Sequence, residues 1–366
     1  MLDVRGFRGL RFSPGRINTF DDVITPPFDV INPEQRSALA SKSPHNMVHV
    51  ILPRDENGKD KYAVAQEKLE AWIAGGVLAR DDADSFYLVR QSFRGLDGKE
   101  HVRRGFFGVV KVPEKGERAI LGHERTFAYK IADRLALTAA TKTNLGAVFS
   151  LYRDPAGELA PFLDQMNQRE PDATATTIDG VRQEFWRTPH DEQITTFFQD
   201  KTLYIADGHH RFATAEAYRD RMREESAQPE GGPLRRYDYV LMGFVDYHDP
   251  GFMIYPTHRL LDLPEGCTVA SLLKELQPWF TTAKVGGDLA PLVEKARGTV
   301  LGLALNSGER YLLTLRDIPR EQVMGTDRTA AWRDLDVALL HRAILEKTLG
   351  FEEGAEFVNE HSAKVA

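Results

Sequence analysis

Hydrophobic residues recur along this chain with two different spacings, one typical of helices and the other of strands. Tyr62, Ala65, Leu69 and Trp72 are three or four residues apart, which predicts a helix with one apolar face that ends at Gly75-Gly76. Residues 86–93 and 102–112 are apolar segments on either side of a turn sequence at 96–99, and they predict a pair of strands. Both kinds of element are interleaved along the chain, which indicates a mixed α+β (α/β) fold.

The same pattern assigns the remaining elements. Asp179-Gly180 predicts a hairpin between residues 173–178 and 181–186. We divide the chain into an N-terminal α+β region (1–150), a region that carries the main polar motif and shares a site with the first (151–259), and a C-terminal α+β region (260–366). The other expected elements are strands at 48–52, 147–152, 202–206, 239–247 and 252–255, a strand pair around 306–308, and helices at 269–276 and 335–349.

Composition and charge exclude several classes of protein. The 366 residues include 47 basic and 54 acidic side chains, for a net charge of −7, which argues against general binding to nucleic acid. Cys267 is the single cysteine, so the chain can form no internal disulfide and no cysteine-built metal centre. No apolar run approaches the roughly 20 residues of a membrane span, and the first residues lack the apolar segment of a signal peptide. We therefore expect a cytoplasmic protein without membrane contacts.

A proline-rich segment precedes the first predicted helix. Residues 25–34 contain three prolines, and consecutive prolines favour an extended backbone. Asp29 is therefore held on a stiff segment, which suits a fixed catalytic acid as well as a residue that stabilises a turn. Asn32 followed by Pro33 is typical of a helix start.

The most informative polar motif is Asp207-Gly208-His209-His210-Arg211, which follows the predicted strand at 202–206 and opens a helix. Free N–H groups at a helix start attract anions, Gly208 lets a ligand approach the backbone, and Arg211 offers a planar group that fits two phosphate oxygens. His209 and His210 could donate to a phosphate. Asp207 could hold a metal ion, a ribose hydroxyl or the helix start. The alternative is an ordinary turn with surface histidines and an arginine paired with a carboxylate.

A second polar cluster spans residues 123–134. Phosphoryl transfer needs a carboxylate to orient or deprotonate a hydroxyl, and cations to neutralise the developing charge. Glu124 or Asp133 could supply the carboxylate, and Lys130 and Arg134 the cations, although a solvated helix face explains the same residues equally well. Farther along, His258-Arg259 could add a second anion contact or be an exposed pair at a strand end.

Two resemblances accompany these motifs. Asp207–Arg211 is similar to the phosphate-binding loop of the ParB/sulfiredoxin-like superfamily, in particular its free-serine kinases, which implies a nucleotide-binding core with additional α+β regions. A larger part of the chain resembles the uncharacterised "domain of unknown function 1015" family, which implies no particular activity. The stretches that carry this second resemblance are Pro26–Ile31, His123–Thr126, Lys130 with Asp133-Arg134, Asn144, Ala206–Phe212 and Pro256–Arg259.

These observations lead to one main expectation. We expect a nucleotide-dependent phosphotransferase that uses ATP or ADP with Mg²⁺ to phosphorylate a small hydroxyl-bearing metabolite, such as a serine-like one. Residues 208–211, with His258 and Arg259, would hold the nucleotide, Asp207 would hold the metal, and Glu124, Asp133 or Asp29 would activate the acceptor.

Two alternatives stay open. One is a nucleotide-binding regulatory module without turnover, and the other is a metal-dependent hydrolase that uses His209, His210 and nearby acids. The sequence lacks the Walker A, G-x-G-x-x-G and G-x-S-x-G motifs, which disfavours ordinary ATPases, dinucleotide dehydrogenases and serine hydrolases. Nothing in the sequence indicates the oligomeric state.

Overall fold

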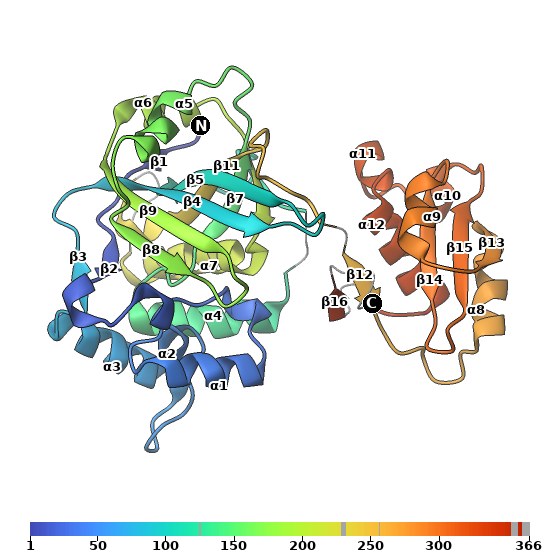
Figure 1. Ribbon diagram of the computed structural model, residues 1–366, viewed down its shortest axis with the longest axis horizontal. Helices are drawn as coiled ribbons and strands as arrows, with labels where there is room; N and C mark the ends of the chain where they lie inside the picture. Colours follow the sequence, from blue (N-terminus) through green and yellow to red (C-terminus); the bar gives the residue numbers. More distant parts are fainter. Residues whose placement is uncertain (124–125, 228–231, 256, 353–357, 361–366) are drawn as a thin grey trace. The chain divides into compact units, whose positions relative to one another are not determined.

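The computed structural model describes all residues except 124–125, 228–231, 256, 353–357 and 361–366. The chain divides into two compact units, Met1–Met253 and Ile254–Ala366 (Figure 1). This boundary lies a few residues before the one expected at 259–260. The two regions expected within residues 1–253 contribute strands to one sheet, and they therefore form a single unit.

The first unit is built on a mixed sheet that has nine strands among the described residues. Their order is β6-β10-β7-β11-β5-β4-β9-β8, with β1 beside β5. β11 is parallel to β7 and β10 is parallel to β6, and the other neighbours are antiparallel. The strands are β1 (Val4–Arg5), β4 (Ser85–Arg94), β5 (Glu100–Lys111), β6 (Ile120–Leu121), β7 (Val148–Tyr152), β8 (Ala173–Thr176), β9 (Arg182–Pro189), β10 (Leu203–Asp207) and β11 (Tyr239–Asp246).

Helices cover one face of this sheet in two layers (Figure 1). α4 (Ala128–Thr141) and α7 (His209–Glu225) pack against each other beside the sheet. α3 (Lys61–Ala74) packs on α4, and α2 (Val48–Ile51) and α1 (Pro33–Lys42) continue this outer layer. A small strand pair, β2 (Leu10–Phe12) and β3 (Leu78–Arg80), adjoins α3.

The main hydrophobic core lies on the opposite face, under α5 (Ala160–Leu163) and α6 (Glu192–Phe198). Phe106 stacks on Phe244 with ring centroids 4.7 Å apart, and Phe198 of α6 packs against both. Apolar side chains fill the centre of this face.

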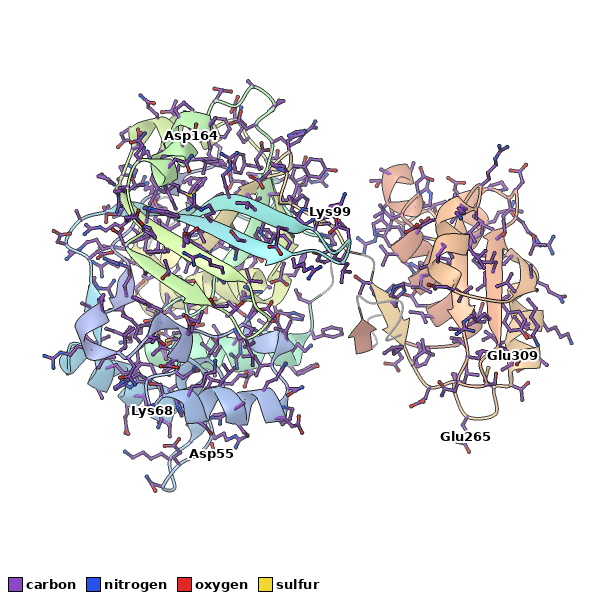
Figure 2. The ribbon with its side chains drawn as sticks, viewed as in Figure 1. Asp55, Lys68, Lys99, Asp164, Glu265 and Glu309 are labelled. Atoms are coloured by element: carbon purple, nitrogen blue, oxygen red, sulfur yellow. The ribbon has the colours of Figure 1, made fainter. Side chains whose placement is uncertain are left out.

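Local sequence signals explain several element boundaries. Asn32 accepts a hydrogen bond from the Gln35 N–H while the Gln35 side chain accepts from the Asn32 N–H, which is the reciprocal cap that starts α1. α3 ends at Gly75, as its spacing predicts. The turn at 96–99 joins β4 to β5, and Lys99 lies at the end of this hairpin (Figure 2). The hairpin expected around Asp179-Gly180 forms as β8 and β9.

Two expected strands are absent from the described residues. The segment expected as a strand at 48–52 is the short helix α2, in which Val48, Val50 and Ile51 are all buried. A short apolar run that is buried on every side has no period to separate helix from strand. Residues 252–255 contain no strand, because a turn after β11, in which Asp249 accepts from the Gly251 N–H, leads the chain away from the sheet.

The second unit contains a three-stranded antiparallel sheet in the order β13-β15-β14 and an antiparallel strand pair, β12 with β16. The helix expected at 269–276 and the strand pair expected around 306–308 are both confirmed. The expected helix at 335–349 is α12 followed by the π-helical segment η6. The elements are β12 (His258–Leu260), α8 (Val269–Leu276), β13 (Phe280–Val285), α9 (Leu289–Lys295), β14 (Val300–Ala304), β15 (Arg310–Leu315), α10 (Arg320–Met324), α11 (Ala330–Arg333), α12 (Asp336–Leu339), η6 (Leu340–Thr348) and β16 (Val358–Glu360).

The aromatic core under α6 should dominate the stability of the first unit. Replacing the fully buried Phe198 by Ala removes its contacts with Phe106 and Phe244, and we expect Phe198→Ala to lower the free energy of unfolding by about 3–5 kcal/mol. Urea unfolding followed by circular dichroism measures this loss. Val30→Ala, at a side chain that is 63% exposed, is the control and should change little. Equal effects of the two substitutions would contradict this description of the core.

Candidate functional site

A cavity of about 510 Å³ lies in the first unit, on the sheet face that carries α4 and α7. Its floor is formed by side chains of β4, β5, β7, β9 and β11, and its other walls by residues 25–28, α4, the segment 144–147 and the start of α7. This volume is within the range of small-molecule sites in proteins. The polar and charged residues that line it are Thr25, Gln91, Arg103, Arg134, Thr138, Asn144, Thr177, Asp179, Gln183, Asp207, Arg211 and Thr214.

The cavity reaches the junction between β10 and α7. The strand ends at Asp207, Gly208 adopts a left-handed conformation with φ of 93°, and α7 begins at His209. A Cβ atom at position 208 would lie 2.9 Å from the guanidinium carbon of Arg211, so glycine is required both by its φ and by the space that Arg211 occupies. The room over Gly208, which the sequence assigned to a ligand, is thus filled by the Arg211 side chain.

Arg211 is held by three groups. Its guanidinium donates to the Ala147 carbonyl and to the Asp207 carboxylate, and an oxygen of Asp29 lies 4.0 Å from it. The side chain is only 12% exposed, and its Nε atom is buried without a hydrogen-bond partner within the described residues. A buried, unsatisfied N–H beside a cavity is a site at which an oxygen of a ligand would relieve an energetic cost.

Asp29 lies on a single helical turn, η3 (Phe28–Val30), that follows Pro26-Pro27. The stiff segment therefore brings this carboxylate next to Arg211, far along the chain. Burial raises the pKa of Asp29, Arg211 lowers it, and the neighbouring charge of Asp207 raises it again, for a net upward shift. An aspartate with a raised pKa accepts a proton more readily than an ordinary one.

Arg134 lines the cavity but is fixed by the protein. It donates to the Ile51 carbonyl at 2.7 Å and to Asp133, and its guanidinium lies 4.3 Å from the centre of the Phe28 ring. Lys61 and Tyr62 donate to the same Asp133 carboxylate. Burial raises the pKa of Asp133, but these donors outweigh burial and hold it at about 2. Asp133 therefore stays ionised, makes a poor proton acceptor, and serves to position Arg134.

The two histidines of the motif do not line the cavity. His209 is buried, and its Nε2 accepts a hydrogen bond from the His123 N–H at 3.1 Å. The Nε2 of His210 accepts from the Phe127 N–H at 3.1 Å, and the His210 ring stacks on the Phe127 ring. Both side chains therefore fasten the start of α7 to the segment that precedes α4, instead of pointing to the space where a ligand would bind.

The remaining expected site residues are distributed differently. Lys130 lies over the Phe127 and Tyr129 rings, at 5.3 and 5.9 Å from their centres, and does not line the cavity. Glu124 lies outside the described residues. His258 and Arg259 belong to β12 of the second unit, where Arg259 donates to His341 at 3.3 Å.

A polar row across the sheet was missed by the sequence analysis. Gln91 of β4 pairs directly with Arg103 of β5 on one side and with Gln183 of β9 on the other, and all three side chains line the cavity. Because directly paired residues point to the same face of a sheet, the pairing assigns these three residues to one face. The pairing register that aligns them is set by the folded sheet, so no local signal in the sequence finds them.

Metal-binding geometry was searched over the described residues. No three His, Cys, Asp or Glu side chains among them converge as ligands of one ion. Asp207 and Asp29 nevertheless both lie near the same terminal nitrogen of Arg211. One or two carboxylates are sufficient for Mg²⁺ when phosphate oxygens supply further ligands.

Among the described residues, no helix has the length and apolar composition needed to cross a membrane.

These features define a two-unit α+β protein with an arginine-lined cavity in its first unit. The model of the family described as "Protein of unknown function (DUF1015)" matches residues 4–338, and the chain belongs to this family. The match begins at β1 and extends to α12, so it includes every cavity residue and most of the second unit. No curated protein and no solved structure matches the chain significantly.

The structural role of Asp133 can be tested by its pH dependence. Because the folded-state pKa of Asp133 is about 2, below its usual value, the carboxylate stabilises the fold above about pH 4, and this contribution is lost as the pH falls towards 2. We expect Asp133→Asn to lower the free energy of unfolding by about 1–2 kcal/mol at pH 7, allowing for solvent screening, and by less below pH 4.

Urea unfolding between pH 3 and pH 7 measures this change. Asp164→Asn is the control, since Asp164 is exposed and its nearest cation, Arg104, is 3.4 Å away (Figure 2). A penalty for Asp133→Asn that does not depend on pH would contradict the described ion pairs.

Proposed function

We propose that this protein is a nucleotide-dependent phosphotransferase that acts on a small hydroxyl-bearing metabolite, with its site in the 510 Å³ cavity. One observation carries the proposal: Arg211 lies at the start of the 17-residue helix α7, with two carboxylates near one of its terminal nitrogens and an unsatisfied Nε beside the cavity. Anion binding, metal binding and proton acceptance are thereby available within a few ångströms of one another.

The phosphates of the nucleotide would bind at the junction of β10 and α7. The N–H groups of the first helical turn have no acceptor within their own helix, and the helix dipole is positive at this end. Arg211 adds a guanidinium that can pair with two phosphate oxygens. Its present partner, Asp207, is 52% exposed, so the pair is partly solvated and a phosphate can replace the carboxylate at low cost.

Mg²⁺ would then be held by Asp207, released from Arg211, together with oxygens of the nucleotide phosphates, which leaves Asp29 without a metal ligand role. The donor set fits, since Mg²⁺ prefers carboxylate and phosphate oxygens. When bound, the ion would neutralise charge on the nucleotide phosphates.

Asp29 is the best-supported group to activate the acceptor. In the reaction, the bond between the terminal phosphorus of the nucleotide and its bridging oxygen breaks, the acceptor hydroxyl oxygen bonds to that phosphorus, and the hydroxyl proton passes to Asp29. The shortened nucleotide leaves with the electron pair. The raised pKa of Asp29 favours the proton transfer, and Arg211 and Arg134 stabilise the charge on the transferred group. This role replaces the one expected for Asp133.

The likeness of residues 207–211 to the phosphate-binding loops of ParB/sulfiredoxin-like proteins supports the proposal, and a cytoplasmic location would suit a nucleotide substrate. A regulatory module that binds nucleotide without turnover is the second candidate. The Arg211–Asp207 pair favours it, because exchange of this pair on binding would alter the start of α7. The hydrolase alternative is weakened, because the Nε2 atoms of His209 and His210 accept backbone hydrogen bonds and neither side chain lines the cavity.

Nucleotide binding can be measured by thermal shift. We expect ATP or ADP with Mg²⁺, at about 100 times its dissociation constant, to raise the melting temperature by roughly 5 °C or more. Arg211→Gln should abolish the shift, because it removes the guanidinium at the helix start. Arg219→Gln, on the same helix but bound to the Pro113 carbonyl and Asp220, is the matched control and should keep it.

Each variant is compared with its own melting temperature without ligand, so that loss of stability is not mistaken for loss of binding. The absence of a shift with ATP, ADP, CTP and GTP would reject both the phosphotransferase and the regulatory module.

The role of Asp29 can be separated from binding. Asp29→Asn keeps the shape of the side chain but cannot accept the proton, so we expect nucleotide binding to persist while turnover falls about 10²–10⁴-fold. Nucleotide consumption with a panel of hydroxyl-bearing metabolites provides the measurement. Asp200→Asn, at a carboxylate that is 81% exposed, is the control. Turnover unchanged in Asp29→Asn would exclude Asp29 as the base, whereas binding without turnover in the wild type would favour the regulatory module.

A further inference from the structure

We propose that the floor of the cavity binds the carboxylate of the acceptor, so that the substrates of this site are hydroxy acids rather than neutral alcohols. Naming the ligand the acceptor rests on the proposed function. The binding of a carboxylate at this place is independent of phosphoryl transfer. It is carried by the row formed by Gln183, Gln91 and Arg103.

The row is a geometric consequence of strand pairing. In the registers of β4 with β5 and β9, Arg103 and Gln183 are the direct partners of Gln91 on its two sides. Directly paired residues point to the same face of a sheet, with Cβ atoms about 5 Å apart. Two amides and a guanidinium therefore form a continuous polar strip in a floor that otherwise contains Val89, Phe107 and Val245.

The orientation of the Gln91 amide follows from its neighbour. The Nε of Arg103 donates to the Oε1 of Gln91 at 2.9 Å. A guanidinium has donors and no acceptor, so the atom of Gln91 that faces it must be the carbonyl oxygen. The NH₂ group of Gln91 is consequently turned away from Arg103, as a donor. The strip thus offers amide and guanidinium donors with a positive charge, which is complementary to the two oxygens of a carboxylate.

Aromatic rings fix the plane of Arg103. Its guanidinium carbon lies 5.5 Å from the centre of the Phe93 ring and 5.2 Å from that of the Phe149 ring. Such contacts hold an arginine in a defined plane, which reduces the entropy lost when it binds a planar anion. A lysine or a mobile surface arginine would not be arranged in this way.

The strip and the β10–α7 junction line the same cavity and are connected through Phe149. Phe149, which contacts Arg103, is the direct partner of Asp207 in the pairing of β7 with β10. A ligand that crosses Phe149 would have its carboxylate at Arg103 and Gln91 and its hydroxyl towards Asp207, Arg211 and Asp29. The carboxylate then orients the hydroxyl for attack, which a neutral alcohol could not achieve.

The test compares carboxylates with matched neutral compounds in the absence of nucleotide. The pairs are glycerate with glycerol, serine with serinol, and lactate with 1,2-propanediol, and calorimetry or thermal shift measures their dissociation constants. We expect at least one acid to bind ten-fold or more tightly than its neutral partner. Gln91→Glu, which places a carboxylate in the strip, and Arg103→Gln should each weaken that acid at least ten-fold.

Arg90→Gln is the matched control, because Arg90 precedes Gln91 in β4 but points to the opposite face, where it pairs with Glu184. It should leave acid binding unchanged. The inference is overturned if no acid binds, if each neutral compound binds as tightly as its acid, or if Gln91→Glu and Arg103→Gln, shown to be folded by circular dichroism, bind like the wild type. Because nucleotide is absent, acid binding without nucleotide turnover would reject the proposed function alone, and nucleotide turnover without acid binding would reject this inference alone.

Discussion

The site depends on how one arginine side chain is folded back over one glycine. Gly208 has a positive φ and no Cβ, so the guanidinium of Arg211 can lie over the backbone where β10 becomes α7. There it contacts the Ala147 carbonyl and lies near two carboxylates that come from different parts of the chain. A Cβ at position 208 would lie 2.9 Å from the guanidinium carbon, so Arg211 would have to shift. The arrangement at the β10–α7 end of the cavity thus depends on this close approach.

The two faces of the sheet differ in how they are packed. Aromatic residues from the strands and from α5 and α6 pack on one face and form the main hydrophobic core of the first unit, and a smaller cluster around Trp72 lies among the helices. The other face is not packed in this way, and its strands carry Gln91, Arg103 and Gln183 into a cavity roofed by α4, α7 and residues 25–28. Because a rigid sheet forms the floor, polar groups there are held in place with little loss of entropy on binding.

The sequence predicts the elements better than it predicts their assembly. Helical and strand periodicity locates α3, β4, β5, β8, β9 and α8, and the cap at Asn32 locates the start of α1. The prediction from periodicity fails at α2, because a short buried apolar run has no spacing that separates a helix from a strand. Of the residues that the sequence singles out, Arg134, Asp207 and Arg211 line the cavity, and Asp29 lies beside Arg211. His209 and His210 do not line it, since a histidine ring that accepts a backbone N–H looks the same in sequence as one that binds a ligand. The strip at Gln91 depends on register and is missed.

The bonds from the backbone to His209 and His210 have a mechanical consequence. They tie the first turn of α7 to His123 and Phe127, immediately before α4, and α4 carries Arg134. A displacement of the first turn of α7 would therefore strain these two hydrogen bonds and act on the N-terminal end of α4. The place of Arg134 at the cavity is in this way coupled to the start of α7.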